Sequence, residues 1–346
     1  MGTYFARRFL LMIPTFLGIT MMVFMITRLV PGGPIDQIIQ RIEMGGGRGE
    51  GGAAGARGGA GQGTRIPPEV MKELEKRFGW DKPAPVAYAH WLWDTVRLDL
   101  GKSYKYNTPV LGVISSRFPV SIYFGLIGFL LAYSICVPLG VVKAIHHGGA
   151  FDFASSVLVF VGYSIPGWAL GALLLVYMGG GEFWNWIPLG GFRSPGWEEM
   201  GFWARVGDQI HHTIAPVMCY AVGSFATLTV LMKNSLMENL GQDYVRTAFA
   251  KGLPERRVIF THALRNSLIP ICTGLGHALG VLMAGSYLIE FVFNINGIGY
   301  LGFTSLVERD YAVVLGILVI NTLLVLFGNI MSDVLYVVAD PRIRFT

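Results

Sequence analysis

The stretch DYVRTAFAKGLPERRVIFTHALRNSLIP, residues 243–270, separates two strongly apolar segments of the chain. Its first part carries four apolar side chains at helical spacing: Tyr244, Val245, Ala248 and Phe249. Gly252 then stops this pattern, and Leu253 and Pro254 open a second one. The stretch therefore predicts a helix, a turn and a second helix, where a plain connector would be short and polar. A loop of this construction indicates a docking surface for a partner.

The composition of the whole chain is that of an integral membrane protein. Hydrophobic residues make up 53% of it and charged residues 14%, and the mean hydropathy is +0.51. Lipid requires each spanning segment to satisfy its own backbone hydrogen bonds, which a helix of roughly 20 residues does. We therefore expect an all-α fold with six transmembrane helices and both termini on one side. The predicted spans are about 9–30, 118–142, 153–178, 210–232, 269–292 and 312–338.

The orientation follows from the lysines and arginines near the ends of the spans, which are retained in the cytoplasm. One side of the membrane carries most of them: Arg7, Arg8, Lys143, Lys233, Arg246, Lys251, Arg256, Arg257, Arg265, Arg342 and Arg344. The two short loops on the other side hold only Arg193, Arg205 and Arg309. Both termini and the loop at 233–268 are therefore predicted to be cytoplasmic. This asymmetry explains the net charge of +5, so that no nucleic-acid partner is expected.

Three regions follow from the spans. Residues 1–30 form an N-terminal segment and the first transmembrane helix, which we interpret as a retained anchor because it is too long for a signal peptide. Residues 31–117 form an exported loop, whose glycine-rich insertion at 45–63 is too poor in apolar side chains to fold alone. After it, Tyr88 and several tryptophans are predicted to anchor a small layer at the membrane surface. Residues 118–346 form a core domain with five spans.

Two further features concern the core domain. The second exported loop, about 179–209, is rich in aromatic side chains and is predicted to lie at the headgroup level. Pro166 and Pro216 fall inside predicted spans and are expected to kink or open them locally.

We find no arrangement of residues that predicts catalysis, a nucleotide site or a metal site in this chain. The segment Leu100–Ser103 ends like a phosphate-binding loop, but Val96 stands where that motif needs glycine. The histidines at 146–147 and 211–212 are adjacent and point apart on a helix, so solvated or interfacial positions are expected for them. The three cysteines fall within or next to spans and are predicted to pack in apolar surroundings: Cys136, Cys219 and Cys272.

Polar side chains inside spans are candidates for a translocation path, because lipid disfavours them. The candidates are His277, Asn321, Asn329, Ser332 and Asp333. Asn321 and Ser332 lie three helical turns apart on one face, with Gly328 close to it, and this stripe is explained equally well by helix packing. Glu290, just before FNINGIG, is better explained as a cap of the following turn than as a substrate ligand.

The segment RTAFAKG at 246–252, followed by HALRNSLIP, resembles the cytoplasmic signature loop of ATP-binding-cassette (ABC) importer permeases of the dipeptide, oligopeptide and nickel family. Arg246 stands where the general signature has Glu, and Arg265 where it has Pro, as is usual in the peptide branch. Four more stretches support the resemblance: RRFLLMIPTFLGITMMVFMITRLVPGGP, LIEFVFNINGIGYLG, RDYAVVLG and SDVLYVVADPRIRF. The GGP motif and the extended exported loop are similar to the Yej-type oligopeptide branch, in its first membrane subunit.

The resemblance implies a type I ABC importer permease fold in the bacterial inner membrane, with the exported loop in the periplasm. It implies three protein partners: a second homologous permease subunit, ABC ATPase subunits that bind ATP and Mg²⁺, and a periplasmic peptide-binding protein. No cofactor is implied for this chain itself. The residues implied to couple it to the ATPase are Tyr244, Val245, Ala248 and Phe249 as a buried knob, with Arg246, Thr247, Lys251 and Gly252 around it.

Three alternatives remain open at this stage. Within the family, the substrate could be a dipeptide or a nickel chelate instead of an oligopeptide. From another class, an ion-driven secondary transporter would show internal repeats and acidic relays, whereas the acidic residues here are confined to span ends. The third alternative is a scaffold that performs no transport.

Overall fold

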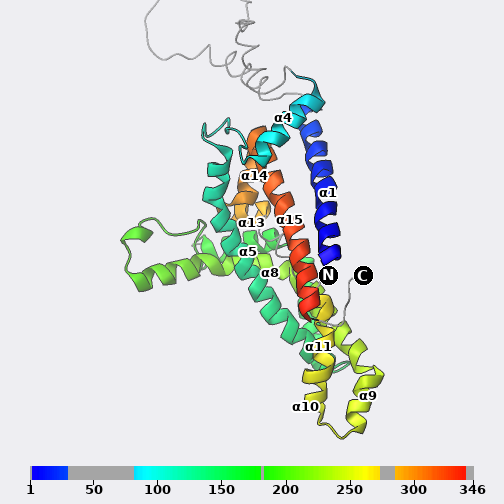
Figure 1. The fold of residues 1–346 in the computed structure, drawn as a ribbon. Coiled ribbons are helices and arrows are strands. Elements are labelled where there is room, and N and C mark those ends of the chain that lie inside the picture. The colour runs from blue at the N-terminus through cyan, green and yellow to red at the C-terminus, as the bar shows by residue number, and fades with distance from the viewer. Residues whose placement is uncertain (1, 30–81, 181–182, 273–284, 340–346) are drawn as a thin grey trace, which may run out of the picture. The chain divides into compact units, whose positions relative to one another are not determined.

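The computed structural model describes residues 2–29, 82–180, 183–272 and 285–339. Within these ranges every regular element is helical, apart from an isolated bridge between Lys102 and Pro109, so the all-α prediction is confirmed there (Figure 1). The helices are α1 (Gly2–Leu29), α4 (Ala84–Val96), α5 (Val110–Ile145), α6 (Ala150–Ser164), α7 (Gly167–Leu174), α8 (Phe202–Leu240), α9 (Asp243–Ala250), α10 (Glu255–Arg257), α11 (Leu264–Ser267), α13 (Tyr287–Val292), α14 (Ile298–Val307) and α15 (Tyr311–Ala339). Two short π-helices, η1 (Leu175–Gly179) and η3 (Val258–Ala263), and one short 3-10 helix, η2 (Trp197–Glu199), complete the described elements.

The described ranges contain four helices that are long and apolar enough to cross a membrane, namely α1, α5, α8 and α15. The bent pair of α6 with α7 and η1 gives a fifth when it is counted as one span. The predicted span 269–292 falls largely on residues 273–284, which lie outside the described residues. A count of six and the orientation of the termini therefore stay predictions.

The helix breaks at one of the two prolines that were predicted to disturb a span. Around Pro166 the chain turns by 88° between α6 and α7, and Ile165 before it is extended, as residues that precede proline prefer. A Cβ at Gly167 would clash with the carbonyl oxygen of Cys219, so the bend also brings α7 closely against α8. Pro216, by contrast, lies inside α8, which continues without interruption.

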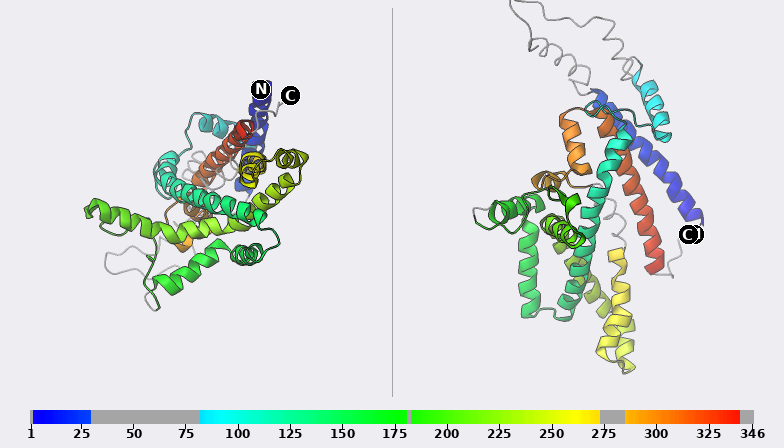
Figure 2. Two further views of the ribbon diagram at one scale, coloured as in Figure 1. Left: turned by 90° about the horizontal axis from the view of Figure 1, so that it is seen from below. Right: turned by 90° about the vertical axis from the view of Figure 1, so that its left-hand side faces the viewer.

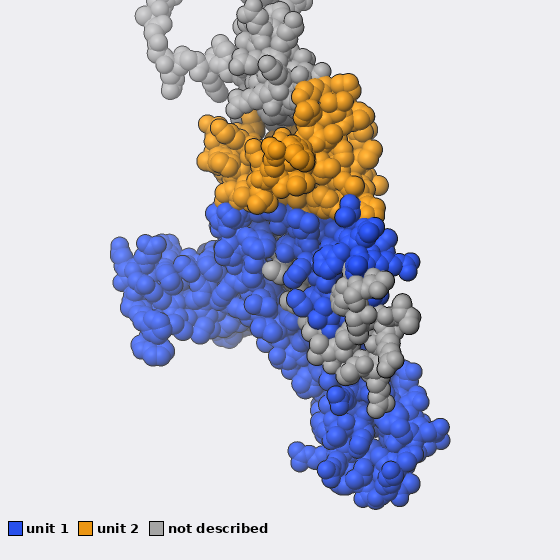
Figure 3. Space-filling view, in the orientation of Figure 1, with its two compact units in different colours: residues 1–13, 114–303, 320–346 blue, residues 14–113, 304–319 orange. Residues whose placement is uncertain are grey.

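The chain divides into two compact units, coloured separately in Figure 3. Unit 1 comprises residues 1–13, 114–303 and 320–346, and unit 2 comprises residues 14–113 and 304–319.

Unit 2 contains a helix, α4, that the sequence did not reveal. Prolines begin α4 at its first turn, where the missing N–H costs no helical hydrogen bond. Its Tyr88 and Trp91 pack against Phe24 of α1, with ring centroids 5.5 and 5.7 Å apart, and the Tyr88 hydroxyl lies 2.9 Å from Thr20 Oγ1. Tyr88 therefore packs against α1, and its place in a layer at the membrane surface stays a prediction.

The segment Leu100–Ser103, which resembles the end of a phosphate-binding loop, contributes to the packing of unit 2. Ser103 Oγ donates to Asp310 Oδ2 at 2.5 Å, and the backbone N–H of Lys105 donates to the same oxygen at 3.2 Å. Asp310 precedes α15 and is buried. The serine hydroxyl is therefore committed to joining this segment to the start of α15.

The described part of unit 1 contains two apolar clusters. The first, called the lower cluster, joins α5, α8, α9, η3 and the residues after α11, and consists of Val141, Ala144, Met232, Leu236, Val245, Ala248, Val258, Ala263 and Ile271. The second, called the upper cluster, joins α5, α8, α13 and the turn after it, and includes Phe124, Cys219, Tyr220 and Phe293. Cys136 and Cys219 are buried among apolar side chains, as predicted, and Cys272 is half-buried.

Candidate coupling loop and the polar groups of the bundle

The predicted helix, turn and helix are present as α9, the turn at Gly252 and the helical segment α10–η3–α11 (Figure 1). The end of α9 is a Schellman motif, in which Gly252 N–H donates to Phe249 O at 2.9 Å and Leu253 N–H donates to Ala248 O at 3.3 Å. Gly252 has a φ of +78°, a left-handed conformation that glycine adopts without a Cβ penalty. No atom lies within 4 Å of a Cβ built there, so the requirement for glycine is conformational and not steric.

The four apolar residues of α9 divide into two pairs with different surroundings. Val245 is 0% exposed and Ala248 is also buried, both within the lower cluster of this chain. Tyr244 and Phe249 point outward, and Phe249 is 46% exposed. The expected knob of four residues is therefore wrong in part, because Val245 and Ala248 attach α9 to its own chain. Only Tyr244 and Phe249 remain available to a partner.

The polar side chains of α9 lie around this exposed pair. Arg246 Nη1 lies 3.6 Å from Asp243 Oδ1, and both side chains are exposed. Thr247 Oγ1 donates to the Asp243 carbonyl at 2.8 Å, so its hydroxyl is used within the helix. Lys251 is exposed at the end of the helix. The surface offered by α9 is thus two aromatic rings with cationic groups beside them.

The helical segment after the turn, α10–η3–α11, attaches this loop to α8. Val258, Ile259 and Ala263 of η3 are buried. Ser235 Oγ of α8 donates to the Ser267 carbonyl at 3.0 Å, while Ser267 Oγ lies 3.3 Å from the Ser235 carbonyl. A force applied to α9 therefore acts on the ends of α5 and α8 through packed side chains, and not through a loose connector.

Four of the five predicted path candidates lie on α15, and the fifth lies outside the described residues. Asn321 and Asn329 are half-buried, Ser332 is buried, and His277 lies outside the described residues. Asn321 Oδ1 is buried and has no hydrogen-bond partner among the described residues. Asp333 is explained differently, because Arg8 of α1 donates to its carboxylate at 2.7 Å. A role of the α15 residues in translocation stays a prediction.

Glu290 forms a densely bonded polar centre of unit 1. Its side chain is 0% exposed, and Oε2 accepts a hydrogen bond from the Tyr300 backbone N–H at 2.7 Å, in the first turn of α14. Its Oε1 lies 2.9 Å from Ser121 Oγ of α5 and 3.4 Å from the Tyr220 hydroxyl of α8. The cap predicted for Glu290 is confirmed. The contacts with Ser121 and Tyr220 could not be read from the sequence, because those residues lie 169 and 70 positions away.

Both hydroxyls around Glu290 also receive a backbone N–H. Ile298 N–H donates to Ser121 Oγ at 2.7 Å, and Ser286 N–H donates to the Tyr220 hydroxyl at 3.1 Å. A Cβ at Gly297 would lie 2.5 Å from Glu290 Oε1. The glycines of the NGIG sequence therefore permit the backbone to fold closely around one buried carboxylate.

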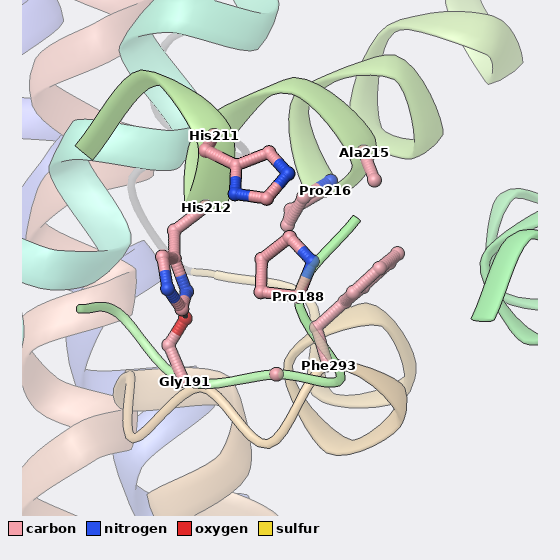
Figure 4. Close-up of a pocket in the computed structure, with 8 residues that line it drawn as sticks. Pro188, Gly191, His211, His212, Ala215, Pro216 and Phe293 are labelled. Atoms are coloured by element: carbon pink, nitrogen blue, oxygen red, sulfur yellow. Dashed lines mark hydrogen bonds between the residues drawn. The ribbon is translucent and has the colours of Figure 1, made fainter. Parts of the chain in front are cut away.

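The loop at about 179–209, which is predicted to be exported, is bonded to α8 through two histidines (Figure 4). His212 Nδ1 lies 3.1 Å from the Gly191 carbonyl, and its Nε2 lies 3.0 Å from Ser194 Oγ, which donates to Asp208 Oδ1 at 2.5 Å. His211 Nε2 lies 2.6 Å from the Trp186 carbonyl. The solvated position expected for His212 is wrong, since its side chain is 4% exposed. Loop carbonyls and Asp208 replace the water that the ring would otherwise need.

The aromatic side chains of this loop are mostly exposed, among them Phe183, Trp184, Trp186, Phe202 and Trp203. Exposed rings of this kind, next to polar backbone, are typical of side chains at the level of lipid headgroups. Among the residues described, no three potential metal ligands gather in one place.

Comparisons with known proteins agree with this arrangement. Residues 136–345 match the family described as "Binding-protein-dependent transport system inner membrane component". The chain is 39% identical to the "Inner membrane ABC transporter permease protein YejB" of Escherichia coli O157:H7 and 36% identical to the "Peptidoglycan transport system permease protein YejB" of Agrobacterium fabrum, covering 100% of this chain and 99% of each relative. It is 32% identical to the "Oligopeptide transport system permease protein AppB" of Bacillus subtilis over the whole of both chains.

The match to the family extends from α5 to the end of the chain and so includes the α9 loop, the Glu290 centre and α15. The relatives carry ABC permease and peptide-transport names and align over their full length. Together with several apolar helices, this similarity makes the chain a multi-pass membrane protein. It belongs to the binding-protein-dependent transport system inner membrane components, as a permease subunit of the ABC transporter type.

Proposed function

We propose that this chain is one of two different membrane subunits of an ATP-driven importer of oligopeptides in the bacterial inner membrane. The observation that carries the proposal is the construction of α9. Two exposed aromatic side chains, Tyr244 and Phe249, are mounted on a helix whose other face is buried in the lower cluster. Interfaces derive much of their binding free energy from such aromatic residues on a fixed support.

Oligopeptides are the substrate that the name of the AppB relative supports, since it is described as an oligopeptide transport permease. The A. fabrum YejB relative is described as a peptidoglycan transport permease. In this proposal a periplasmic binding protein delivers the peptide to the exported side, and a second homologous permease forms the other half of the path. The residues proposed to contribute from this chain are Asn321, Asn329, Ser332 and His277.

ATP and Mg²⁺ bind to the partner ATPase subunits and not to this chain. The ATPase receives Tyr244 and Phe249 on the cytoplasmic side, with Arg246 and Lys251 at the rim of the contact. Closure of the ATPase around ATP then displaces α9, and the lower cluster transmits that displacement to α5 and α8.

The test is the Phe249→Ala variant in the complete transporter, reconstituted in lipid with its ATPase subunits and binding protein. We expect ATPase stimulation by peptide-loaded binding protein, and peptide uptake, to fall about tenfold or more, since truncation of a central aromatic residue costs about 2 kcal/mol or more. Phe153→Ala is the matched control, because this ring on α6 is more exposed than Phe249 and lies on another helix. The control should behave like the unaltered protein.

Two outcomes would overturn the proposal. Full ATP-dependent uptake by the Phe249→Ala and Tyr244→Ala variants would show that α9 does not contact the ATPase. Uptake that follows an ion gradient and ignores ATP would favour the secondary transporter instead.

A further inference from the structure

Three charged side chains from three helices meet at the turn between α5 and α6. The Asp152 carboxylate of α6 accepts hydrogen bonds from Lys233 Nζ of α8 at 2.7 and 2.8 Å, and Lys143 Nζ of α5 lies 3.1 Å from it. Lys143 is 1% exposed and also donates to the hydroxyls of Ser155 and Ser156 at 2.8 and 2.7 Å. The buried ammonium group is thus surrounded by acceptors, as burial of a charge requires.

The turn itself contributes to the same carboxylate. Gly148 N–H donates to Asp152 Oδ2 at 3.2 Å, and His147 Nδ1 lies 3.4 Å from that oxygen. In this way Asp152 fixes the start of α6 to the end of α5, which runs beside it (Figure 2), and to α8 at the same time. We call Asp152, Lys143 and Lys233 the ionic triad.

The ionic triad adjoins the lower cluster, which includes Val245 and Ala248 of α9. Lys143 lies between Val141 and Ala144 in α5, and Lys233 follows Met232 in α8; these three apolar residues belong to the cluster. A displacement of α9 that moves this part of α5 and α8 therefore moves both lysines. Asp152 and the start of α6 are bound to both.

From α6 a contact route leads toward the upper cluster. α6 and α7 both pack along α8, and α7 packs against α13. At that contact a Cβ on Gly171 would lie 2.8 Å from the ring of Phe293, so helix and ring touch without space between them. The 88° bend at Pro166 separates the two halves of this route.

We propose that Asp152 is a positioning residue, which makes α6 and α7 follow the movement of α9. The proposal rests on the proposed function, in which an ATPase moves α9. An ionic contact suits this role better than apolar packing does. Apolar side chains of similar volume often stabilise a fold equally well, but they allow sliding, whereas two directional hydrogen bonds to one carboxylate do not.

The test uses the complete transporter in lipid and measures two quantities for each variant: ATP hydrolysis and peptide uptake. Asp152→Asn removes the charge and leaves the side-chain volume almost unchanged. We expect this variant to retain ATP hydrolysis and to lower the number of peptides imported per ATP at least about fivefold, the lower end of measured allosteric couplings. Lys233→Met, which removes the positive partner of this contact, should likewise retain ATP hydrolysis and lower the number of peptides imported per ATP.

A charge-conserving variant distinguishes positioning from general stability. Lys233→Arg keeps the positive charge beside Asp152 and should retain more than half of the uptake per ATP of the unaltered protein, whereas Lys233→Met should not. An unchanged ratio of uptake to hydrolysis in Asp152→Asn and Lys233→Met would overturn the role of Asp152 and leave the proposed function intact. Peptide uptake that does not require ATP in the unaltered protein would instead overturn the proposed function itself.

Discussion

Replacement of Glu290 by Gln should destabilise unit 1, although the two side chains have nearly the same shape. The carboxylate has only donors around it: the hydroxyls of Ser121 and Tyr220 at Oε1, and the Tyr300 backbone N–H at Oε2. An amide offers one acceptor and one donor. Whichever way the amide is turned, its NH₂ group faces at least one of these donors.

The magnitude follows from the two orientations of the amide. With the NH₂ group toward Tyr300, the backbone N–H at the start of α14 loses its acceptor. With the NH₂ group toward the hydroxyls, Ser121 and Tyr220 lose the acceptor of their protons, and each already accepts a backbone N–H. A buried unsatisfied group costs about 1–3 kcal/mol. We therefore expect the free energy of unfolding to fall by about 1–3 kcal/mol.

The assay is equilibrium unfolding of the purified chain in mixed micelles, with tryptophan fluorescence as the signal. Glu308→Gln is the matched control: it has the same chemistry, but Glu308 is exposed and makes one ion pair, with Lys105 at 2.8 Å, of a kind worth about 0–1 kcal/mol. Equal stability of Glu290→Gln and the unaltered protein would refute the reasoning. Such a result would mean that the carboxyl group already carries a proton.

Three further predictions concern single contacts. Gly252→Ala should weaken the α9 turn by about 1–2 kcal/mol, because alanine is strained at a φ of +78°, and faster amide hydrogen exchange at α9 would report it; unchanged exchange would contradict this. Arg8→Ala should cost at most about 1 kcal/mol in the same unfolding assay, since its partner Asp333 lies in a partly exposed pair; a larger loss would indicate a role beyond pairing. His212→Ala should release the loop at 191–194 and speed tryptic cleavage at Arg193, while His211→Ala, at an exposed ring with one hydrogen bond to the loop, should have a smaller effect; equal cleavage rates for the two variants would contradict a role of His212 in holding this loop.

The local signals of the sequence predicted the coupling loop well. Gly252 and Pro254 delimit two helices because their effects on the backbone act within a few residues. Pro166 marks the break between α6 and α7 for the same reason. Glu290 was recognised as a cap because the turn it caps follows immediately in the chain.

Other features depend on partners far along the chain, and no local pattern reveals them. The ionic triad joins positions up to 81 residues apart, and Lys143 and Lys233 resembled ordinary cytoplasmic charges at span ends. The amphipathic pattern of α9 identified an apolar face, but it could not indicate which residues this chain covers itself. Val245 is buried and Phe249 is exposed, and this difference is visible only in the packed structure.

The length of α8 has a mechanical consequence. Its 39 residues extend about 58 Å at 1.5 Å per residue, nearly twice the roughly 30 Å of a bilayer's hydrocarbon core. Even tilted by about 40°, the upper end of the observed range, such a rod emerges from the apolar layer. His212, which bonds to the loop at 191–194, lies toward the beginning of this helix, and Ser235, which bonds to Ser267, lies close to its other end, so that a tilt of α8 would displace both contacts together.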